Sequence, residues 1–135
     1  MWMKAEGIHH IDLRVSDYQK SISFYNSILR PLGFGREYVK GEKVTCYVRG
    51  ATSIGIRPVK KRPVRVVSYS YKRAGMHHLA ISVPSKKDVD NFYRLLKLKN
   101  VRVLYPPKRY PQYSRGYYAV FFLDPDGMEL EVLHW

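Results

Sequence analysis

The amino-acid sequence predicts an α+β fold in which two tandem βαβββ modules form a curved mixed sheet around a cleft. The first observation behind this prediction is a repeat, because "GIHHIDLRV" at residues 7–15 returns as "GMHHLAISV" at residues 75–83. The same shift of 68 positions, from Gly7 to Gly75, aligns "FY" at 24–25 with "FY" at 92–93. The second observation is that one helix-like pattern and three strand-like segments follow each copy. Such ungapped matches in a short chain indicate a duplicated supersecondary unit.

The length of the chain limits how these modules can be organised. At 135 residues the chain can bury one core and is too short for two independent domains. We therefore expect a single domain over residues 1–135. The first module spans about 7–59 and the second about 75–135, and the basic stretch 60–74 connects them.

Each module opens with an alternating strand followed by a helix start. In the first module the apolar face holds Ile11, Leu13 and Val15, and the opposite face holds His10, Asp12 and Arg14. Asp17 then predicts a helix N-cap, and Ser85 followed by Asp88 predicts a capping box in the second module. Apolar residues at helical spacing follow: Ile22, Tyr25 and Leu29 in the first module, and Val89, Phe92 and Leu96 in the second.

Short β-rich segments follow each helix. They are "REYVK", "KVTCYVR" and "TSIGIRP" in the first module, and "RVLYP", "GYYAVFFLD" and "MELEVLHW" in the second. "DPDG" at 124–127 predicts a tight turn between the last two strands, because proline presets its φ angle and glycine accepts a positive one. Each module therefore has the order β-α-β-β-β.

The strand pattern assigns the histidines to two sides of these sheets. A sheet that carries its helix on one face leaves the other face open, and two such faces can curl around a cavity. His10 and His78 point away from their apolar neighbours and toward the open side. His9 and His77 fall on the helix-facing side, near its edge.

The last strand adds a carboxylate to the open side. Met128, Leu130 and Val132 take its helix-facing side, which leaves Glu131 opposite. Two imidazoles and one carboxylate form a facial site for a divalent transition metal, with positions left for water or substrate. We therefore predict that His10, His78 and Glu131 bind a metal ion.

Three segments carry a resemblance to a known family. "GIHHIDLRVSDYQKSISFY", "GMHHLAISV" and "FFLDPDGMELEV" resemble the vicinal oxygen chelate superfamily of glyoxalases, bleomycin-resistance proteins and extradiol dioxygenases. The resemblance runs from Gly7 to Val132 and implies paired βαβββ modules around a metal-lined cleft. It implies the same ligands, His10, His78 and Glu131, for an ion of zinc, iron, manganese, nickel or cobalt, and it implies a homodimer.

The chain departs from glyoxalase I at the fourth ligand. The resemblance implies a glutamate, or a glutamine in an epimerase, on the last strand of the first module, where this chain has Gly55. That carboxylate completes the metal site and shuttles the substrate proton, so glyoxalase I chemistry is not favoured. Asp12, on the face of His10, or a water molecule could compensate. An alternative role for Asp12 is a surface or salt-bridged carboxylate near Arg14.

Two further subfamilies that use three ligands also differ from this chain. Extradiol dioxygenases have a tyrosine four residues before the turn proline and a histidine several residues earlier, where this chain has Phe121 and "QYS" at 112–114. Fosfomycin-resistance thiol transferases have a threonine two residues after the first histidine and a tyrosine before the turn, where this chain has Asp12 and Phe121. The sequence fits neither template.

One alternating set of residues in "GYYAVFF" should line the cleft with Glu131. It is either Tyr117, Ala119 and Phe121 or Tyr118, Val120 and Phe122, and the family pattern favours the first set. "KRYPQYSRGYY" should form a mobile wall over the cleft. The candidate substrate-binding residues are Arg14, Arg57, Tyr117 and Phe121, because tyrosine stacks on small organic ligands and arginine pairs with carboxylates. Glu131 is the candidate catalytic residue.

Composition narrows the location and the partners. The net charge is +13, with basic clusters in predicted loops, and no nucleic-acid-binding motif accompanies them, so a nucleic-acid partner is not favoured. No window is apolar enough to span a membrane. The start "MWMKAEG" lacks an apolar leader, and one cysteine, Cys46, excludes an internal disulfide. We therefore expect a cytoplasmic protein without a membrane partner.

These observations lead to two functional hypotheses. The first is a metal-dependent lyase, isomerase or dioxygenase that acts on a small oxygenated organic substrate. The second is a protein of the same fold that sequesters a small molecule or antibiotic without catalysis. Only the first hypothesis requires His10, His78 and Glu131 together, so the three candidate ligands favour the enzyme.

Overall fold

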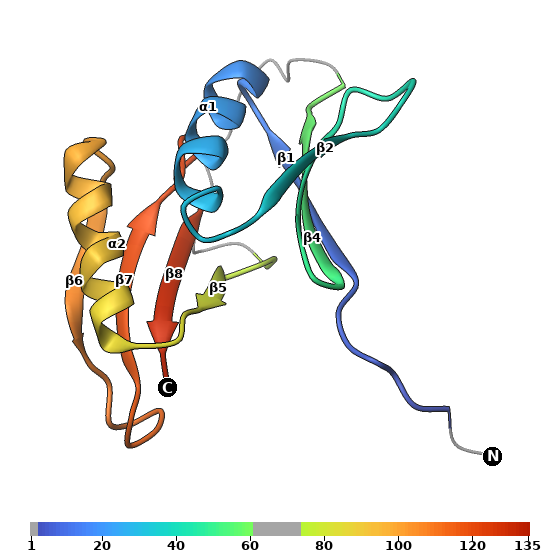
Figure 1. Ribbon diagram of the computed structural model, residues 1–135. Coiled ribbons are helices and arrows are strands. Elements are labelled where there is room, and N and C mark those ends of the chain that lie inside the picture. The colour runs from blue at the N-terminus through green and yellow to red at the C-terminus, as the bar shows by residue number, and fades with distance from the viewer. Residues whose placement is uncertain (1–2, 61–73) are drawn as a thin grey trace. The chain divides into compact units, whose positions relative to one another are not determined.

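The structure is a computed structural model that describes residues 3–60 and 74–135 (Figure 1). The chain divides into two compact units, residues 1–65 and 66–135. This division falls inside the predicted connector. Residues 61–73 of that connector, with most of its basic cluster, lie outside the described residues.

The described part of unit 1 contains one helix and four strands. Its elements are β1 (His10–Val15), α1 (Tyr18–Leu29), β2 (Gly35–Tyr38), β3 (Thr45–Arg49) and β4 (Thr52–Pro58). The strands form one sheet in the order β1-β4-β3-β2. The first and last strands of the unit, β1 and β4, lie side by side and form the one parallel pair of this sheet.

Unit 2 repeats this arrangement. Its elements are β5 (His78–Ser82), α2 (Lys86–Leu98), β6 (Val103–Arg109), β7 (Tyr118–Leu123) and β8 (Glu129–His134). The sheet order is β5-β8-β7-β6, again with a parallel pair between the first and last strands. The predicted α+β class and the two tandem βαβββ modules are therefore confirmed.

Both helices begin where the sequence predicts. The Asp17 side chain accepts a hydrogen bond from the Lys20 amide at 3.0 Å. In unit 2 the Ser85 hydroxyl accepts from the Asp88 amide at 3.2 Å and donates to the Asp88 carboxylate at 2.6 Å. These contacts satisfy amides that have no partner inside the helix.

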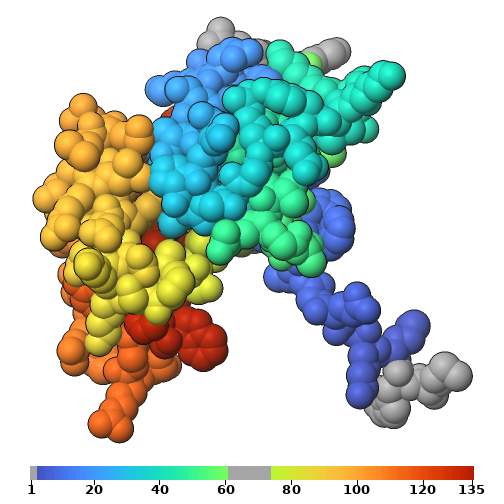
Figure 2. Space-filling view, viewed as in Figure 1, coloured from blue at the N-terminus to red at the C-terminus, as the bar shows by residue number. Residues whose placement is uncertain are grey.

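Each helix covers one face of its own sheet. In unit 2, Phe92 on α2 packs against Phe122 on β7, with ring centroids 5.5 Å apart. Figure 1 shows α2 in front of β6 and β7, and its side chains form the surface on that side of the unit in Figure 2. Ile22, Tyr25 and Leu29 of α1 are buried in the same way in unit 1. Burial of such side chains stabilises the fold by about 1.5–3 kcal/mol each.

The strand β6 is longer than the sequence suggests. It continues past Tyr105 through Pro106 and Pro107 to Arg109, although "KRYPQYSRGYY" was expected to be loop from its first residue. Proline lacks an amide hydrogen, but β6 is an edge strand with register irregularities on either side of Tyr105, where that loss is tolerated. The loop therefore begins at Tyr110, which is buried.

Among the described residues, neither helix has the length and apolar character needed to cross a membrane.

The predicted turn between β7 and β8 is organised by Asp124. Its buried carboxylate accepts hydrogen bonds from the amides of Asp126 at 2.9 Å and Met128 at 2.8 Å. Gly127 has a φ of 84°, a conformation that favours glycine. The turn sets the start of β8 and therefore the position of Glu131.

Replacement of Asp124 by Ala should lower the free energy of unfolding by about 1.5–3 kcal/mol, because the amides of Asp126 and Met128 would lose a charged acceptor. Asp124→Asn keeps one acceptor oxygen and should lose less. Denaturant unfolding of both variants measures the difference, and equal stability of the wild type and Asp124→Ala would contradict this role.

Candidate functional site

Strand pairing brings several polar side chains onto the open face of the unit 2 sheet. In the parallel pair β5–β8, His78 is the register partner of Glu129, and Ala80 is the register partner of Glu131. Phe121 on β7 flanks Glu131 on its other side. Directly paired residues lie on the same face of a sheet, so these side chains share the face opposite α2. The small side chain of Ala80 leaves room beside Glu131.

Glu131 is a buried carboxylate with two polar partners. Only 1% of the residue is exposed. The Tyr117 hydroxyl donates to its Oε1 at 2.6 Å, and Nε2 of His78 lies 3.1 Å from its Oε2. Burial raises the pKa of Tyr117, and the hydrogen bond to Glu131 adds to this, so Tyr117 is a proton donor at neutral pH. A buried charge needs such partners to offset the loss of hydration.

Aromatic side chains surround this carboxylate. Tyr110, Ala119, Phe121 and Leu133 form a buried cluster, against which Tyr117 packs. Tyr118 faces the other way and donates to Asp90 on α2 at 2.8 Å. The expectation that the set Tyr117, Ala119 and Phe121 shares the side of Glu131 is therefore confirmed, whereas a role for Tyr117 and Phe121 in substrate binding stays a prediction.

Tyr110 is a member of this cluster that the sequence analysis did not single out. It is 8% exposed, and within the described part of the chain its hydroxyl meets no hydrogen-bond partner. Burial raises the pKa of Tyr110, followed by the charge of Glu131, so the hydroxyl keeps its proton. A buried donor of this kind is costly unless it meets an acceptor, and an oxygen atom of a ligand would satisfy it. Its sequence signal was weak, because it is one of many tyrosines in a predicted loop.

Each histidine doublet has the same local geometry. Nδ1 of His78 lies 2.8 Å from Nδ1 of His77, and the His9–His10 pair repeats this contact at 2.9 Å. The rings are edge-to-face, with centroids 5.0 and 5.2 Å apart. The prediction that His9 and His77 share the helix-facing side is therefore wrong, because both residues precede their strands, where strict alternation does not apply.

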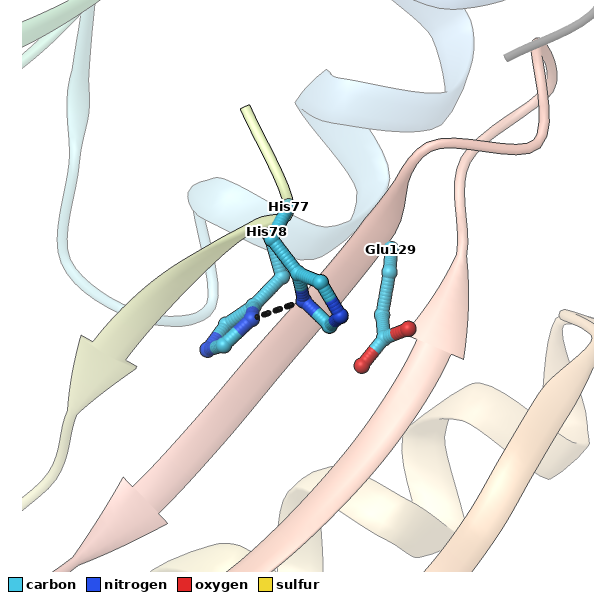
Figure 3. Close-up of side chains that lie close together, drawn as sticks. All are labelled: His77, His78 and Glu129. Atoms are coloured by element: carbon cyan, nitrogen blue, oxygen red, sulfur yellow. Dashed lines mark hydrogen bonds between the residues drawn. The ribbon is translucent and has the colours of Figure 1, made fainter. Parts of the chain in front are cut away.

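Three of these side chains form a group with the spacing of metal ligands. One nitrogen each of His77 and His78 and one carboxylate oxygen of Glu129 lie within 4.8 Å of one another. Figure 3 shows the carboxylate of Glu129 beside the ring of His78, with the His77 ring on the other side. The sequence analysis did not select Glu129. The sequence signal for Glu129 was its position two residues before Glu131, because residues two apart on a strand lie on the same face of the sheet.

The open face of unit 1 carries the other predicted site residues. His10, Asp12 and Arg14 on β1 are register partners of Ser53, Gly55 and Arg57 on β4. Asp12 Oδ2 accepts from Arg57 Nε at 2.5 Å, and Arg57 Nη1 donates to Glu42 Oε2 at 2.8 Å. These two hydrogen bonds raise the pKa of Arg57. The structure thus places Arg57, a predicted substrate-binding residue, between two carboxylates, whereas Arg14 is exposed.

Cys46 also lies on this face, since it is the register partner of Gly55 on β3. Burial raises the pKa of its thiol, and the charge of Asp12 raises it further. The thiolate is the nucleophilic form of cysteine, so Cys46 is a weak nucleophile at neutral pH.

The donors of unit 2 fit a divalent ion. Two ligands each about 2.1 Å from an ion, at a right angle, lie about 3.0 Å apart. The separation of 3.1 Å between His78 Nε2 and Glu131 Oε2 matches this value. His78 Nδ1 is engaged by His77, which leaves Nε2 directed at the carboxylate. A histidine ligand commonly uses its second nitrogen in such a hydrogen bond.

Comparison with known families agrees with this fold. Residues 7–132 match the model of the glyoxalase/bleomycin resistance protein/dioxygenase superfamily. The chain belongs to this superfamily. The resemblance found in the sequence is thereby confirmed over nearly the whole chain.

Individual superfamily members are similar along most of their length. The uncharacterized protein YqjT of Bacillus subtilis (strain 168) is 34% identical over 126 residues, which cover 93% of this chain and 97% of that protein. Metallothiol transferase FosB of Staphylococcus epidermidis (strain ATCC 12228) is 30% identical over 130 residues, covering 96% of this chain and 82% of FosB.

Solved structures in the superfamily share the fold. A glyoxalase-like protein from Bacillus halodurans superposes with a TM-score of 0.81 at 27% identity, covering 96% of each chain. The fosfomycin resistance protein FosX of Listeria monocytogenes gives a TM-score of 0.71 at 20% identity, covering 98% of this chain and 95% of FosX. The superfamily and the FosB relatives support a divalent-metal-dependent enzyme family.

Replacement of Tyr117 by Phe should lower the free energy of unfolding by about 1–3 kcal/mol, because Oε1 of the buried Glu131 would lose its donor. Denaturant unfolding measures this, with Tyr113→Phe, at an exposed tyrosine of the same loop, as the control. Equal losses in the two variants would show that the bond to Glu131 contributes nothing specific.

Proposed function

We propose that this protein is a metal-dependent enzyme of the vicinal oxygen chelate type, with His10, His78 and Glu131 as ligands, that acts on a small oxygenated organic substrate. The observation that supports it most is the contact between His78 and Glu131. A buried carboxylate whose second oxygen faces an imidazole nitrogen at 3.1 Å is suited to share a divalent cation with it. His10 would contribute the third donor from the equivalent strand of unit 1.

The residues around these ligands have distinct roles in the proposal. Tyr117 holds Oε1 of Glu131 and so directs Oε2 toward His78. His77 engages Nδ1 of His78, and His9 does the same for His10, which leaves each Nε2 as the donor atom. When bound, the ion would bind substrate oxygen atoms and stabilise the negative charge that develops on them.

The aromatic cluster beside Glu131 is suited to hold the substrate. Phe121, Tyr110 and Tyr117 offer ring faces and edges, and the Tyr110 hydroxyl can donate to a ligand oxygen. Arg14 is exposed on the open face of unit 1 and can pair with an acidic group of the substrate. An anionic, oxygenated organic molecule combines these features.

The residues Gly55 and Phe121 and the similarity to relatives narrow the reaction class. Gly55 offers no carboxylate for a glyoxalase-type isomerisation, and Phe121 offers no acid for ring cleavage by a dioxygenase. The similarity to metallothiol transferases over most of the chain favours transfer of a thiol to the substrate, although Asp12 and Phe121 depart from the fosfomycin-resistance template. The thiol would come from a separate cosubstrate, because the raised pKa of Cys46 keeps that side chain protonated.

The second candidate function is sequestration of a small molecule without catalysis. The buried aromatic cluster and the Tyr110 hydroxyl favour it, since both suit an organic ligand. Sequestration would not require the pairing of Glu131 with His78. Binding of a ligand by a preparation that takes up no metal would support this alternative.

We propose further that the protein acts as a homodimer in the cytoplasm. Dimers are frequent in the superfamily, and the single cysteine suits a reducing compartment. Light scattering coupled to gel filtration measures the assembly state.

The purified protein should bind about one first-row divalent ion per chain. Elemental analysis after chelation and reloading measures this. Glu131→Gln should reduce metal loading, because an uncharged amide is a poorer ligand, and His10→Ala and His78→Ala should do the same. Glu37→Gln, on the exposed edge strand β2, is the matched control and should load normally. Normal loading of all three ligand variants would exclude the proposed site.

His77→Ala should weaken metal affinity by about 10–100-fold, because it removes the hydrogen-bond partner of His78 Nδ1. Competition with a coloured chelator measures the affinity. The control is His134→Ala, because His134 contacts the Val83 carbonyl at 3.2 Å at the far end of β8. A tenfold or greater loss of metal affinity in both variants would mean that the contact of His77 with His78 has no specific role in metal binding.

A further inference from the structure

The parallel strand pair of unit 2 places Glu129 directly beside the second histidine doublet. His78 is the first residue of β5, Glu129 is the first residue of β8, and the two are register partners. Register partners share one face of a sheet, so both side chains lie on the face opposite α2. His77 precedes β5, and its Nδ1 lies 2.8 Å from Nδ1 of His78. This end of the sheet therefore gathers two imidazoles and one carboxylate from unit 2 alone.

These three side chains have the spacing and the chemistry of ion ligands. One nitrogen of each ring and one oxygen of Glu129 lie within 4.8 Å of one another, and Figure 3 shows the two rings beside the carboxylate. Two ligand atoms about 2.1 Å from a tetrahedral ion lie about 3.4 Å apart, so small side-chain rotations are sufficient for coordination. Imidazole nitrogen and carboxylate oxygen together suit Zn²⁺ and similar divalent transition ions.

Unit 1 carries the same doublet without the carboxylate. Nδ1 of His9 lies 2.9 Å from Nδ1 of His10, but the register partner of His10 on β4 is Ser53. A neutral hydroxyl is a poorer ligand for a divalent ion than a carboxylate. Within the described part of the chain, His77, His78 and Glu129 are the one set of three such ligands with this spacing. Glu129 is therefore the residue that distinguishes the two doublets.

This group differs from the proposed metal centre in exposure and in composition. His77 is exposed and Glu129 is half-buried, whereas Glu131 is only 1% exposed, so an ion can reach the group directly from water. The two sets have His78 in common. A neutral imidazole has a free lone pair on only one of its nitrogens, so His78 binds one ion at a time. The group and the proposed centre are therefore alternatives for the same ion.

We propose that His77, His78 and Glu129 form a zinc-type divalent-cation site that is contained within unit 2. The site is distinct from the centre of the proposed function and exchanges its ion with that centre, because both use His78. The inference goes beyond the proposed function, since this site needs neither His10 nor Glu131. The alternative is that Glu129 is a surface carboxylate beside a structural pair of histidines.

The first test measures zinc affinity by chelator competition in the full chain with Glu131→Gln, which removes a ligand of the other centre. This variant should still bind zinc, at a lower affinity than the wild type. Addition of Glu129→Gln should lower the remaining affinity by about tenfold or more, at least the loss seen for residues that only support a ligand. It should also change the visible absorption of the cobalt-loaded protein. Addition of Glu37→Gln, on the exposed strand β2, is the control and should change neither readout.

The second test compares equivalent histidines of the two units in the same Glu131→Gln background. His77→Ala should lower the remaining zinc affinity by about tenfold or more, because it removes a ligand. His9→Ala removes the corresponding ring of unit 1 and should leave that affinity unchanged. His10→Ala, at an exposed position, provides a second background for both tests if Glu131→Gln does not fold.

Two results would overturn the inference. One is a remaining zinc affinity that is the same with and without Glu129→Gln in folded variants. The other is a complete absence of zinc binding in folded Glu131→Gln. The proposed function is judged separately, by the loss of affinity in His10→Ala and Glu131→Gln relative to the wild type. If those two variants load normally while Glu129→Gln does not, the proposed function fails and the site in unit 2 stands.

Discussion

The site depends on the parallel pairing of the first and last strands within each unit. This pairing sets His78 beside Glu129, and Ala80 beside Glu131, although about fifty residues separate them in the chain. The helix takes one face of the sheet, so the polar residues of both strands share the other face. Without this register the imidazole and the buried carboxylate would not meet at 3.1 Å.

Burial of Glu131 then determines the rest of the site in unit 2. A carboxylate with 1% exposure needs donors or a cation, and Tyr117 satisfies only one of its oxygens. The other oxygen faces His78, whose second nitrogen is held by His77. The aromatic cluster around Phe121 limits water access on one side, which strengthens the electrostatic interactions of the carboxylate.

Much of the fold and part of the site could be predicted from sequence. The alternation around Leu13, the caps at Asp17 and Ser85, and the turn at Asp124 are local signals, and the structure confirms each of them. Alternation also placed Glu131 and Tyr117 on one face. It failed for His77, which precedes its strand, and it could not detect Tyr110, whose burial depends on packing between distant segments.

The sequence by itself determined the duplicated modules, the faces of their strands and the superfamily, because periodicity and motifs are properties of neighbouring residues. Only the tertiary structure decided which carboxylate stands beside Gly55, how Arg57 is engaged, and that His77 turns toward His78. These facts depend on register and on side-chain direction across strands. The sequence pattern assigns a side chain only to one face of its strand. Packing and hydrogen bonding decide which residue of a neighbouring strand that side chain contacts.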